Sequence, residues 1–514
     1  MKHSKKLASL LLALVMALSL AVTAFADEST TYSITINNST AGHTYEAYQI
    51  FTGDLATNEA GNKVLSNIVW GPGVSEAGQT ALGDAAAKAE TLKTEADAKA
   101  FAKAVAPYLA TAAGSANTVT DGKYVISGLA AGYYLVKDQD GSLTGDNDSY
   151  TEYIIQVVGN VTATPKSDVP EVEKKVKDTN DSTGVTSDWQ DSADYDIGDS
   201  VPFQLKATLA DNVSSYTTYK VVFHDTLSKG LTYNNDAKVY IDGTETNRFT
   251  VTATVNADGT TTLTVSCDDV KDLGAGNSSV ITVEYTAKLN ENAVLGSVGN
   301  PNEVYLEYSN NPNKSEEGNN ETGETPKDVV IVFTYKTIIN KVDSETKPLT
   351  GAAFKLEKLI KGEDGAADAW TTIKEFAVDG TTTSFTFSGL DDGQYKLTET
   401  KTPVGYNTID PIYFVIEATH GETADVPTLK TLNAYLTDAN GNKQTEMKDG
   451  ESVNIDLGTV DLTAGSITTT VVNKSGSELP STGGIGTTIF YVLGGVLVLA
   501  AVVLLVTKKR MGNN

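Results

Sequence analysis

The sequence is almost without cysteine, because Cys267 is the single one among 514 residues. One thiol cannot form a disulfide within the chain, so a protein of this length must be stabilised by core burial or by another kind of crosslink. Cys267 lies in the segment Val265-Ser266-Cys267-Asp268, which lacks the context of a catalytic thiol. We therefore expect it to be a buried or half-buried strand residue.

Positive charge is scarce as well. The chain has 39 Lys and Arg against 66 Asp and Glu, a formal net charge of -27. Phosphate binding needs a basic surface, so this charge argues against a nucleic-acid partner. The 4 histidines are scattered, and neither a zinc-binding spacing nor a Ser/His/Asp arrangement is discernible. The sequence thus predicts no metal site, no cofactor and no enzyme that turns over repeatedly.

Both ends of the chain carry uncharged apolar runs. Near the start, three lysines precede the run 7–22 and then Ala24-Phe25-Ala26, a small-x-small cleavage pattern. This predicts a secretory signal peptide over residues 1–26, cut between Ala26 and Asp27. Near the other end, the run 485–506 is long enough to cross a hydrocarbon core of about 30 Å, and Lys508-Lys509-Arg510 marks its cytoplasmic side. We expect the part between these runs to lie outside the membrane.

Most of the remaining length alternates apolar and polar residues in short runs rich in Val, Thr, Tyr and Ile. This pattern is typical of half-buried strands, and the length suits about three domains. Residues 250–255 and 261–265 predict a hairpin, because a Gly-containing turn separates them. Residues 76–112 are instead rich in Ala, Lys, Glu and Leu. The expected fold is mainly β, with tandem Ig-like β-sandwich domains and a helical insertion in the first.

Two composition breaks suggest where the domains end. Residues 164–170 include two prolines among polar residues, and residues 310–326 form a polar stretch that we expect to be a linker or loop. A third polar segment, 474–478, precedes the C-terminal apolar run. The predicted domains are therefore 28–165, 170–325 and 328–476, followed by a terminal segment over 479–514.

The terminal segment opens with Leu479-Pro480-Ser481-Thr482-Gly483. This pentapeptide, followed by an apolar run and a basic tail, resembles the LPXTG sorting signal of Gram-positive surface proteins. The resemblance implies transient membrane insertion and cleavage by a sortase between Thr482 and Gly483. The chain would then be attached covalently to the cell wall.

The third domain carries a second motif, Tyr395-Lys396-Leu397-Thr398-Glu399-Thr400-Lys401-Thr402-Pro403-Val404-Gly405-Tyr406. It resembles the E-box of Gram-positive pilins and of CnaB-type Ig-like domains, whose first and last strands are matched around Lys341 and Asn473. The resemblance implies an amide between the Lys341 amine and the Asn473 side chain, with Glu399 as general acid and base. Alternation puts Lys341 on one face with Tyr335, Thr337 and Ile339. Burial there should lower the pKa of the lysine and raise that of a carboxylic acid.

The second domain has a comparable set of residues. Alternation in Glu171-Val172-Glu173-Lys174-Lys175-Val176 favours Lys174 over Lys175 as the inward lysine. The segment Phe223-His224-Asp225-Thr226-Leu227-Ser228-Lys229-Gly230-Leu231 resembles the part of CnaA-like pilin domains that carries a catalytic aspartate, here Asp225. Asn302 would be the bonding partner of Lys174, with Asn300 as the alternative.

The first domain begins with segments that resemble the N-terminal domain of major pilins, over 32–38 and 42–51. Its end, Thr162-Ala163-Thr164-Pro165-Lys166, resembles the pilin motif, although Thr164 stands where an aromatic residue is usual and no tryptophan precedes the strand. The resemblance implies that a sortase joins Lys166 to Thr482 of another subunit. Lys63, Lys123 and Lys137 are available for a further internal bond, but no motif selects among them.

The sequence is thus identified as a shaft subunit of a sortase-assembled pilus, and not as an enzyme. The implied partners are a pilin-specific sortase, other copies of the chain, minor pilins and, through a housekeeping sortase, peptidoglycan; a host surface ligand stays open. The alternative is a wall-anchored adhesin or a minor, basal pilin that is not polymerised. Lys166 and the lack of a large inserted adhesive domain favour the shaft.

Overall fold

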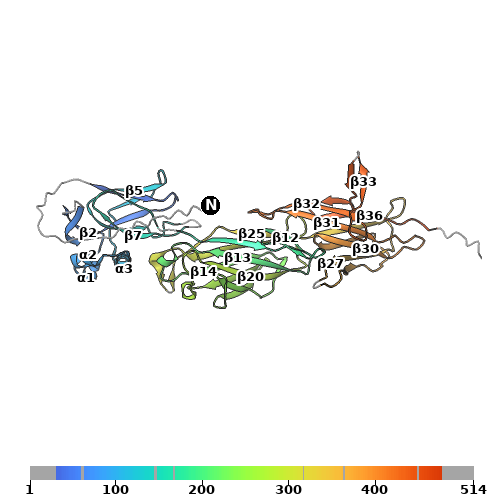
Figure 1. The fold of residues 1–514 in the computed structure, drawn as a ribbon, viewed down its shortest axis with the longest axis horizontal. Helices are drawn as coiled ribbons and strands as arrows, with labels where there is room; N and C mark the ends of the chain where they lie inside the picture. The colour runs from blue at the N-terminus through green and yellow to red at the C-terminus, as the bar shows by residue number, and fades with distance from the viewer. Residues whose placement is uncertain are drawn as a thin grey trace, which may run out of the picture.

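The computed structural model describes residues 31–58, 63–143, 148–165, 168–316, 318–362, 365–448 and 451–476. Strands dominate these ranges and form three sandwiches that follow one another along the long axis (Figure 1). The expected signal peptide with Ala26 and Asp27, Lys166, the sorting pentapeptide and the apolar run 485–506 lie outside them. Among the described residues, no helix has the length and apolar character needed to span a membrane.

The first sandwich combines a three-stranded sheet, in the order β5-β1-β8, with a second sheet in the order β3-β2-β6-β7, where β4 also pairs with β2. The strands are β1 (Tyr32–Asn37), β2 (Tyr45–Thr57), β3 (Lys63–Trp70), β4 (Gly114–Ala116), β5 (Lys123–Leu129), β6 (Gly132–Asp138), β7 (Glu152–Val157) and β8 (Val161–Ala163). The expected helical insertion is confirmed as α1 (Glu76–Leu82), α2 (Ala85–Thr91) and α3 (Glu95–Val105), followed by the short η1 (Ala106–Tyr108). A capping box between Thr94 and Asp97 begins α3.

The middle sandwich packs two larger sheets around one apolar core. One sheet has the order β12-β25-β21-β14-β19-β18, with β24 beside β21; the other has the order β17-β16-β20-β13-β9, with β15 beside β20. The first sheet consists of β12 (Ser192–Asp194), β14 (Val221–Leu227), β18 (Thr250–Val255), β19 (Thr261–Cys267), β21 (Asn300–Ser309), β24 (Thr322–Glu324) and β25 (Asp328–Phe333). The second consists of β9 (Glu171–Val176), β13 (Ser200–Thr208), β15 (Leu231–Tyr233), β16 (Lys238–Ile241), β17 (Thr244–Thr246) and β20 (Val280–Leu289).

The smaller features of the middle sandwich agree with the sequence. The expected hairpin is the antiparallel pair β18 and β19, and Cys267 at its end is half-buried. Two short ribbons complete this region: β10 (Thr179–Asn180) with β11 (Val185–Thr186), and β22 (Ser315–Glu316) with β23 (Asn319–Asn320). The remaining elements are the short helices η2 (Val213–Ser215), η3 (Lys271–Leu273) and η4 (Pro312–Lys314).

The third sandwich has sheets in the orders β29-β26-β36-β35 and β28-β27-β30-β31-β32, which enclose a core of aromatic and aliphatic side chains. Its strands are β26 (Tyr335–Val342), β27 (Ala353–Ile360), β28 (Ala369–Glu375), β29 (Ser384–Leu390), β30 (Gly393–Lys401), β31 (Ile412–His420), β32 (Leu429–Thr437), β35 (Thr459–Asp461) and β36 (Ser466–Val472). A separate hairpin joins β33 (Thr445–Lys448) to β34 (Glu451–Asn454). The mainly β fold with a helical insertion in the first sandwich is confirmed.

The polar stretch 310–326, for which the sequence predicts a linker or loop, contains the short strands β22, β23 and β24. It folds onto the middle sandwich, where β24 pairs with β21, and Asn311 and Ser315 are buried. Its polar groups bond to one another: Nδ2 of Asn311 donates to Glu321, and the Ser315 hydroxyl donates to the Pro312 carbonyl. The strand β25 follows and pairs with β21, so the middle sandwich extends to Phe333 rather than ending at residue 325.

Candidate functional site

The middle sandwich brings Lys174 and Asp225 together inside its core. Lys174 comes from β9 and Asp225 from β14 in the facing sheet, and neither side chain is exposed. The Lys174 Nζ atom lies 2.6 Å from Oδ1 of Asp225. Burial lowers the pKa of Lys174 and raises the pKa of Asp225, because a charged group loses its hydration there. Mutual attraction opposes both changes without reversing them.

Tyr285, on β20, completes this group and was missed by the sequence reasoning. Its hydroxyl donates to Oδ2 of Asp225 and lies 3.2 Å from Nζ of Lys174. Nδ2 of Asn302 donates to the same hydroxyl oxygen at 2.7 Å. Burial raises the pKa of Tyr285, and the carboxylate of Asp225 raises it further, so the phenol keeps its proton. Alternation along β20 would have put Tyr285 on the inward face with Val283 and Ala287.

The alternatives left open by the sequence occupy different surroundings. Nζ of Lys175 pairs with Asp191 and is partly exposed. Asn300 is buried, but its Oδ1 accepts from the Val294 amide and its Nδ2 donates to two carbonyls. The Oδ1 atom of Asn302, in contrast, is buried without a hydrogen-bond partner. Of the four candidates, Lys174 and Asn302 are therefore the pair that faces Asp225.

The third sandwich holds Lys341, Glu399 and Asn473, all of them buried. Nδ2 of Asn473 donates to Oε2 of Glu399 at 3.0 Å, while Oε1 of Glu399 and Oδ1 of Asn473 are buried without a hydrogen-bond partner. Nζ of Lys341 donates instead to the carbonyls of Val342 and Val471, each at 3.0 Å. Burial lowers the pKa of Lys341 despite the neighbouring Glu399. The inward alternation expected for Lys341 is confirmed by the burial pattern of β26, and Asn473 is buried as well.

The two groups differ in how the lysine and asparagine strands are related. Lys174 and Asn302 lie on β9 and β21, which belong to opposite sheets. Lys341 lies on β26, which pairs in parallel with β36, and Asn473 directly follows β36. A bond in the middle sandwich would therefore join its two layers, whereas a bond in the third sandwich would join neighbouring strands of one layer.

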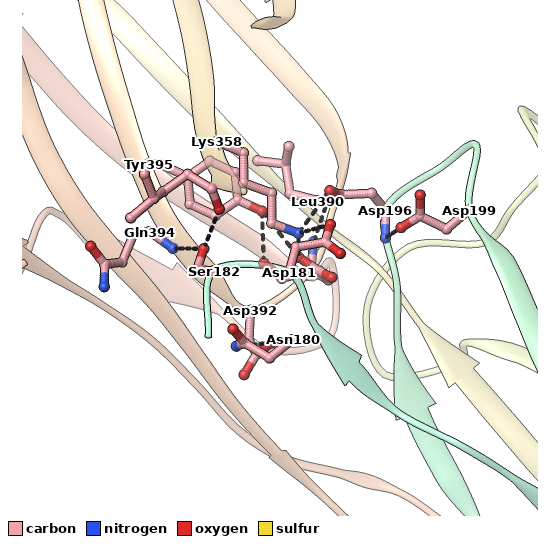
Figure 2. A network of polar contacts seen from close by, with 12 residues as sticks. Asn180, Asp181, Ser182, Asp196, Asp199, Lys358, Leu390, Asp392, Gln394 and Tyr395 are labelled. Atoms are coloured by element: carbon pink, nitrogen blue, oxygen red, sulfur yellow. Dashed lines mark hydrogen bonds and ion pairs between the residues drawn. The ribbon is translucent and has the colours of Figure 1, made fainter. Parts of the chain in front are cut away.

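A third buried lysine, Lys358, sits where the middle and third sandwiches meet (Figure 2). Its Nζ atom lies 2.8 Å from Asp196 and 3.0 Å from Asp181, both of the middle sandwich, and it also contacts Asp391 of its own. Burial alone would lower the pKa of Lys358, but the three carboxylates outweigh it and raise the pKa. Lys358 is thus a stable cation, unlike Lys174 and Lys341, and joins two domains by ion pairing.

Comparison with known proteins finds family models that match three parts of the chain. Residues 197–312 match the family described as Gram-positive pilin backbone subunit 2, Cna-B-like domain. Residues 336–431 match a prealbumin-like fold domain, and residues 471–511 match the LPXTG cell wall anchor motif. Together these matches support a Gram-positive, sortase-assembled major pilin. This backbone pilin is a cell-wall-anchored protein of a surface pilus, as its sequence motifs predicted.

Two relatives illustrate the similarity of the backbone pilin to proteins of known type. The trypsin-resistant surface T6 protein of Streptococcus pyogenes serotype M6 is 28% identical over 452 residues, covering 76% of this chain and 77% of that protein. The structure of the T6 backbone pilin, from the same serotype, has a TM-score of 0.55 at 19% identity, covering 89% of this chain and 100% of that one. At this identity the structural similarity supports the fold, and the roles of individual residues stay predictions.

Proposed function

We propose that this backbone pilin forms the shaft of its pilus through an amide between Thr482 of one subunit and Lys166 of the next. A pilin-specific sortase would attack the Thr482 carbonyl with its thiol, breaking the bond to Gly483 and forming a thioester. The Lys166 amine would then displace the thiol. The match of residues 471–511 to the anchor motif supports the first step. In the sequence, Lys166 falls between β8 of the first sandwich and β9 of the middle one, which supports the second step.

We infer further that each of the two larger sandwiches closes an internal crosslink on itself. Nζ of Lys174 would attack Cγ of Asn302, and Nζ of Lys341 would attack Cγ of Asn473; each attack expels the side-chain nitrogen as ammonia. Asp225 and Glu399 would protonate the leaving nitrogen and accept the proton of the lysine. The single observation that carries this proposal is the buried contact of Lys174 with Asp225, joined through Tyr285 to Asn302.

We favour Asn302 over Asn300 as the bonding partner. Oδ1 of Asn302 has no hydrogen-bond partner, whereas Oδ1 of Asn300 already accepts from the Val294 amide. Each predicted segment of the chain would have its own part in assembly. The signal peptide 1–26 would be removed at Ala26 and Asp27, and the domains 28–165, 170–325 and 328–476 would form the shaft. Of the terminal segment 479–514, the part that begins with Gly483 would be exchanged for the next subunit.

A subunit at the pilus base would meet a different nucleophile, because a housekeeping sortase would pass its Thr482 to peptidoglycan. Minor pilins and a host surface ligand would be further partners. The alternative function, a wall-anchored adhesin or basal pilin without polymerisation, would need Thr482 and leave Lys166 unused. The match to a pilin backbone family favours the shaft.

Wall extracts from cells that produce variant chains test the polymer. Lys166→Ala should remove the high-mass ladder and leave monomers, whereas Lys123→Ala, at an exposed lysine of the same sandwich, should leave the ladder intact. A branched peptide joining Thr482 to Lys166 should appear in digests of wild-type pili. A ladder that persists in Lys166→Ala would overturn the assignment.

The internal bonds are tested by the mass of the purified secreted chain, which should be lighter than its sequence by two ammonias. Glu399→Gln should restore one of them, because a carboxamide cannot shuttle the proton. Glu417→Gln, at a half-buried carboxylate that pairs with Lys443, should change nothing. A wild-type mass equal to the unmodified sequence would refute the internal crosslinks. It would not bear on the proposed amide between Thr482 and Lys166.

A further inference from the structure

A second polar group lies at the junction of the middle and third sandwiches, beside the Lys358 network. It consists of Asp178, just after β9, Asp194, at the end of β12, and His420, at the end of β31. One potential ligand atom from each of these three side chains lies within 4.8 Å of the other two. The group is assembled from both sandwiches, since His420 belongs to the third and the two aspartates belong to the middle one.

The hydrogen bonds around His420 fix which ring nitrogen carries a proton. The Ser192 hydroxyl lies 2.9 Å from the Gly421 carbonyl, which can only accept, so the hydroxyl proton is used there. Nδ1 of His420 lies 2.7 Å from the same hydroxyl and must therefore donate to it. In the neutral ring, Nε2 then carries the lone pair, and it faces Oδ2 of Asp178 at 3.4 Å. Two acceptors that face each other need a shared proton or a shared cation.

Each carboxylate of the group has one buried oxygen without a hydrogen-bond partner. Oδ2 of Asp194 and Oδ1 of Asp178 are buried atoms without a hydrogen bond, and Asp194 as a whole is 2% exposed. Leaving a buried carboxylate oxygen unpaired costs free energy. The buried lysine nearest to this group in the junction, Lys358, is already bound by Asp181, Asp196 and Asp391. The Tyr335 hydroxyl also interacts with the Asp194 carboxyl, but it brings no positive charge to the group.

We propose that Asp178, Asp194 and His420 bind a divalent first-row transition metal of the zinc class between the two sandwiches. One imidazole and two carboxylates suit Zn²⁺ better than Ca²⁺, which prefers oxygen ligands alone. The 3.4 Å between Nε2 and Oδ2 is close to the edge of a tetrahedron whose metal–ligand bonds are about 2.0 Å. Ser192 holds the ring by its other nitrogen, as outer partners of metal-bound histidines commonly do.

The ion would serve as a reversible bond between domains. Because its ligands come from both sandwiches, binding stabilises the docked arrangement over any in which the two separate. The Asp178 side chain is 21% exposed, so it offers the ion a path from solvent and leaves room for a water as fourth ligand. This bond would add to the Lys358 ion pairs and would be removable by a chelator.

The secreted chain, stripped with a chelator and titrated with Zn²⁺, tests the site. Calorimetry and native mass spectrometry should find one tightly held Zn²⁺ per chain, and the thermal transition of the docked sandwiches should shift upward. His420→Gln should weaken binding about tenfold or more. The matched control His224→Gln, whose ring pairs with Glu307 on the middle sandwich, should bind as wild type does. Ca²⁺ and Mn²⁺ titrations should give weaker binding than Zn²⁺.

Several results would overturn the site. These are the absence of stoichiometric Zn²⁺, equal binding by wild type and His420→Gln, or a preference for Ca²⁺. If His420→Gln does not fold by circular dichroism, Asp178→Asn at the partly exposed ligand replaces it. Nitrogen NMR of the wild-type ring gives an independent answer: a proton that stays on Nε2 of His420 after Zn²⁺ is added means a histidine–aspartate ion pair and no metal site.

Discussion

Nζ of Lys174 lies 2.6 Å from Oδ1 of Asp225, and neither side chain is exposed to solvent. A buried ion pair gains attraction but loses the hydration of both charges. The pKa of the lysine is lowered and that of the aspartate is raised, so a proton can pass from amine to acid at little cost. The neutral pair that results is the state in which the amine is nucleophilic.

Replacing the acid should stop this chemistry. Asp225→Asn leaves Lys174 without its proton acceptor, so the chain should stay one ammonia heavier than wild type. It also leaves a buried amine unpaired, which costs about 3–5 kcal/mol, and forfeits the crosslink's restriction of the unfolded chain. Intact mass and thermal unfolding measure the two effects. Asp258→Asn, at the exposed turn between β18 and β19, is the control; a wild-type mass for Asp225→Asn would contradict the role.

Tyr285→Phe should slow the same reaction without abolishing it. The phenol joins Asp225 to Asn302, and its loss leaves both acid and amide in place but unconnected. The mass of newly synthesised chain, followed over time, should fall by one ammonia more slowly than in wild type. Tyr233→Phe changes a ring that packs edge-on against Tyr285 and should not alter the rate. Equal rates for wild type and Tyr285→Phe would show that the hydroxyl takes no part.

Lys358→Met should separate the middle and third sandwiches. The change leaves Asp196 and Asp391 buried without their cation, and breaking such a buried pair costs about 3–5 kcal/mol. Calorimetry should resolve two transitions where wild type shows coupled unfolding, and small-angle scattering should detect a wider range of domain orientations. Lys361→Met removes an exposed pair with Asp368 nearby and should have little effect. A single wild-type transition for Lys358→Met would argue against the ion-pair junction.

The stability of the junction should also depend on pH. Burial, with Asp196 and Asp181 nearby, raises the pKa of Asp199 from its usual 3.8 to about 6. Between these values the folded chain keeps a proton that the unfolded chain releases, so the free energy of unfolding falls as pH rises. Asp199→Asn should remove this contribution and be more stable at pH 7 by at most about 2 kcal/mol, a figure reduced for partial exposure.

Thermal unfolding at several pH values, with chelator present, measures the effect. The amide oxygen of Asp199→Asn can still accept from the Asp196 amide, so the loop geometry is kept. Asp258→Asn again serves as the exposed control. If Asp199→Asn and wild type show the same slope between pH 4 and 6, the carboxyl does not hold its proton in the fold.

Strand alternation predicted the inward side chains well. In a strand, successive side chains point to opposite faces, so the neighbouring residues in the sequence are enough to tell which face is buried. Lys174 and Lys341 are both buried as expected. Alternation after Phe354 and Leu356 also puts Lys358 inward, a signal that the sequence contained. The role of Lys358 in joining two domains could not be predicted in this way. It depends on Asp181 and Asp196, which lie near Lys358 only when the two domains are docked. The same holds for His420 and Asp194, since no spacing along the chain indicates that they meet.

Composition was a poorer guide to the end of the middle sandwich. Residues 310–326 are polar enough to be taken for a linker, yet their side chains hydrogen-bond internally and against neighbouring strands. Thr325, for example, is a polar residue that hydropathy would place at the surface. Its hydroxyl nevertheless accepts a hydrogen bond from the Leu306 amide in the buried interior. Polar segments that satisfy their own groups can fold as compactly as apolar ones.

The chain passes from the middle to the third sandwich through Thr334 alone, the one residue between β25 and β26. Its carbonyl accepts from Gly296 and its hydroxyl donates to Leu390, so it is held from both sides. Gly296 also lies so close to Gly465 that a methyl group on either would collide with backbone. The middle and third sandwiches should therefore move together as one rigid unit. Bending along the shaft should then be concentrated at one place in each subunit, between the first and middle sandwiches.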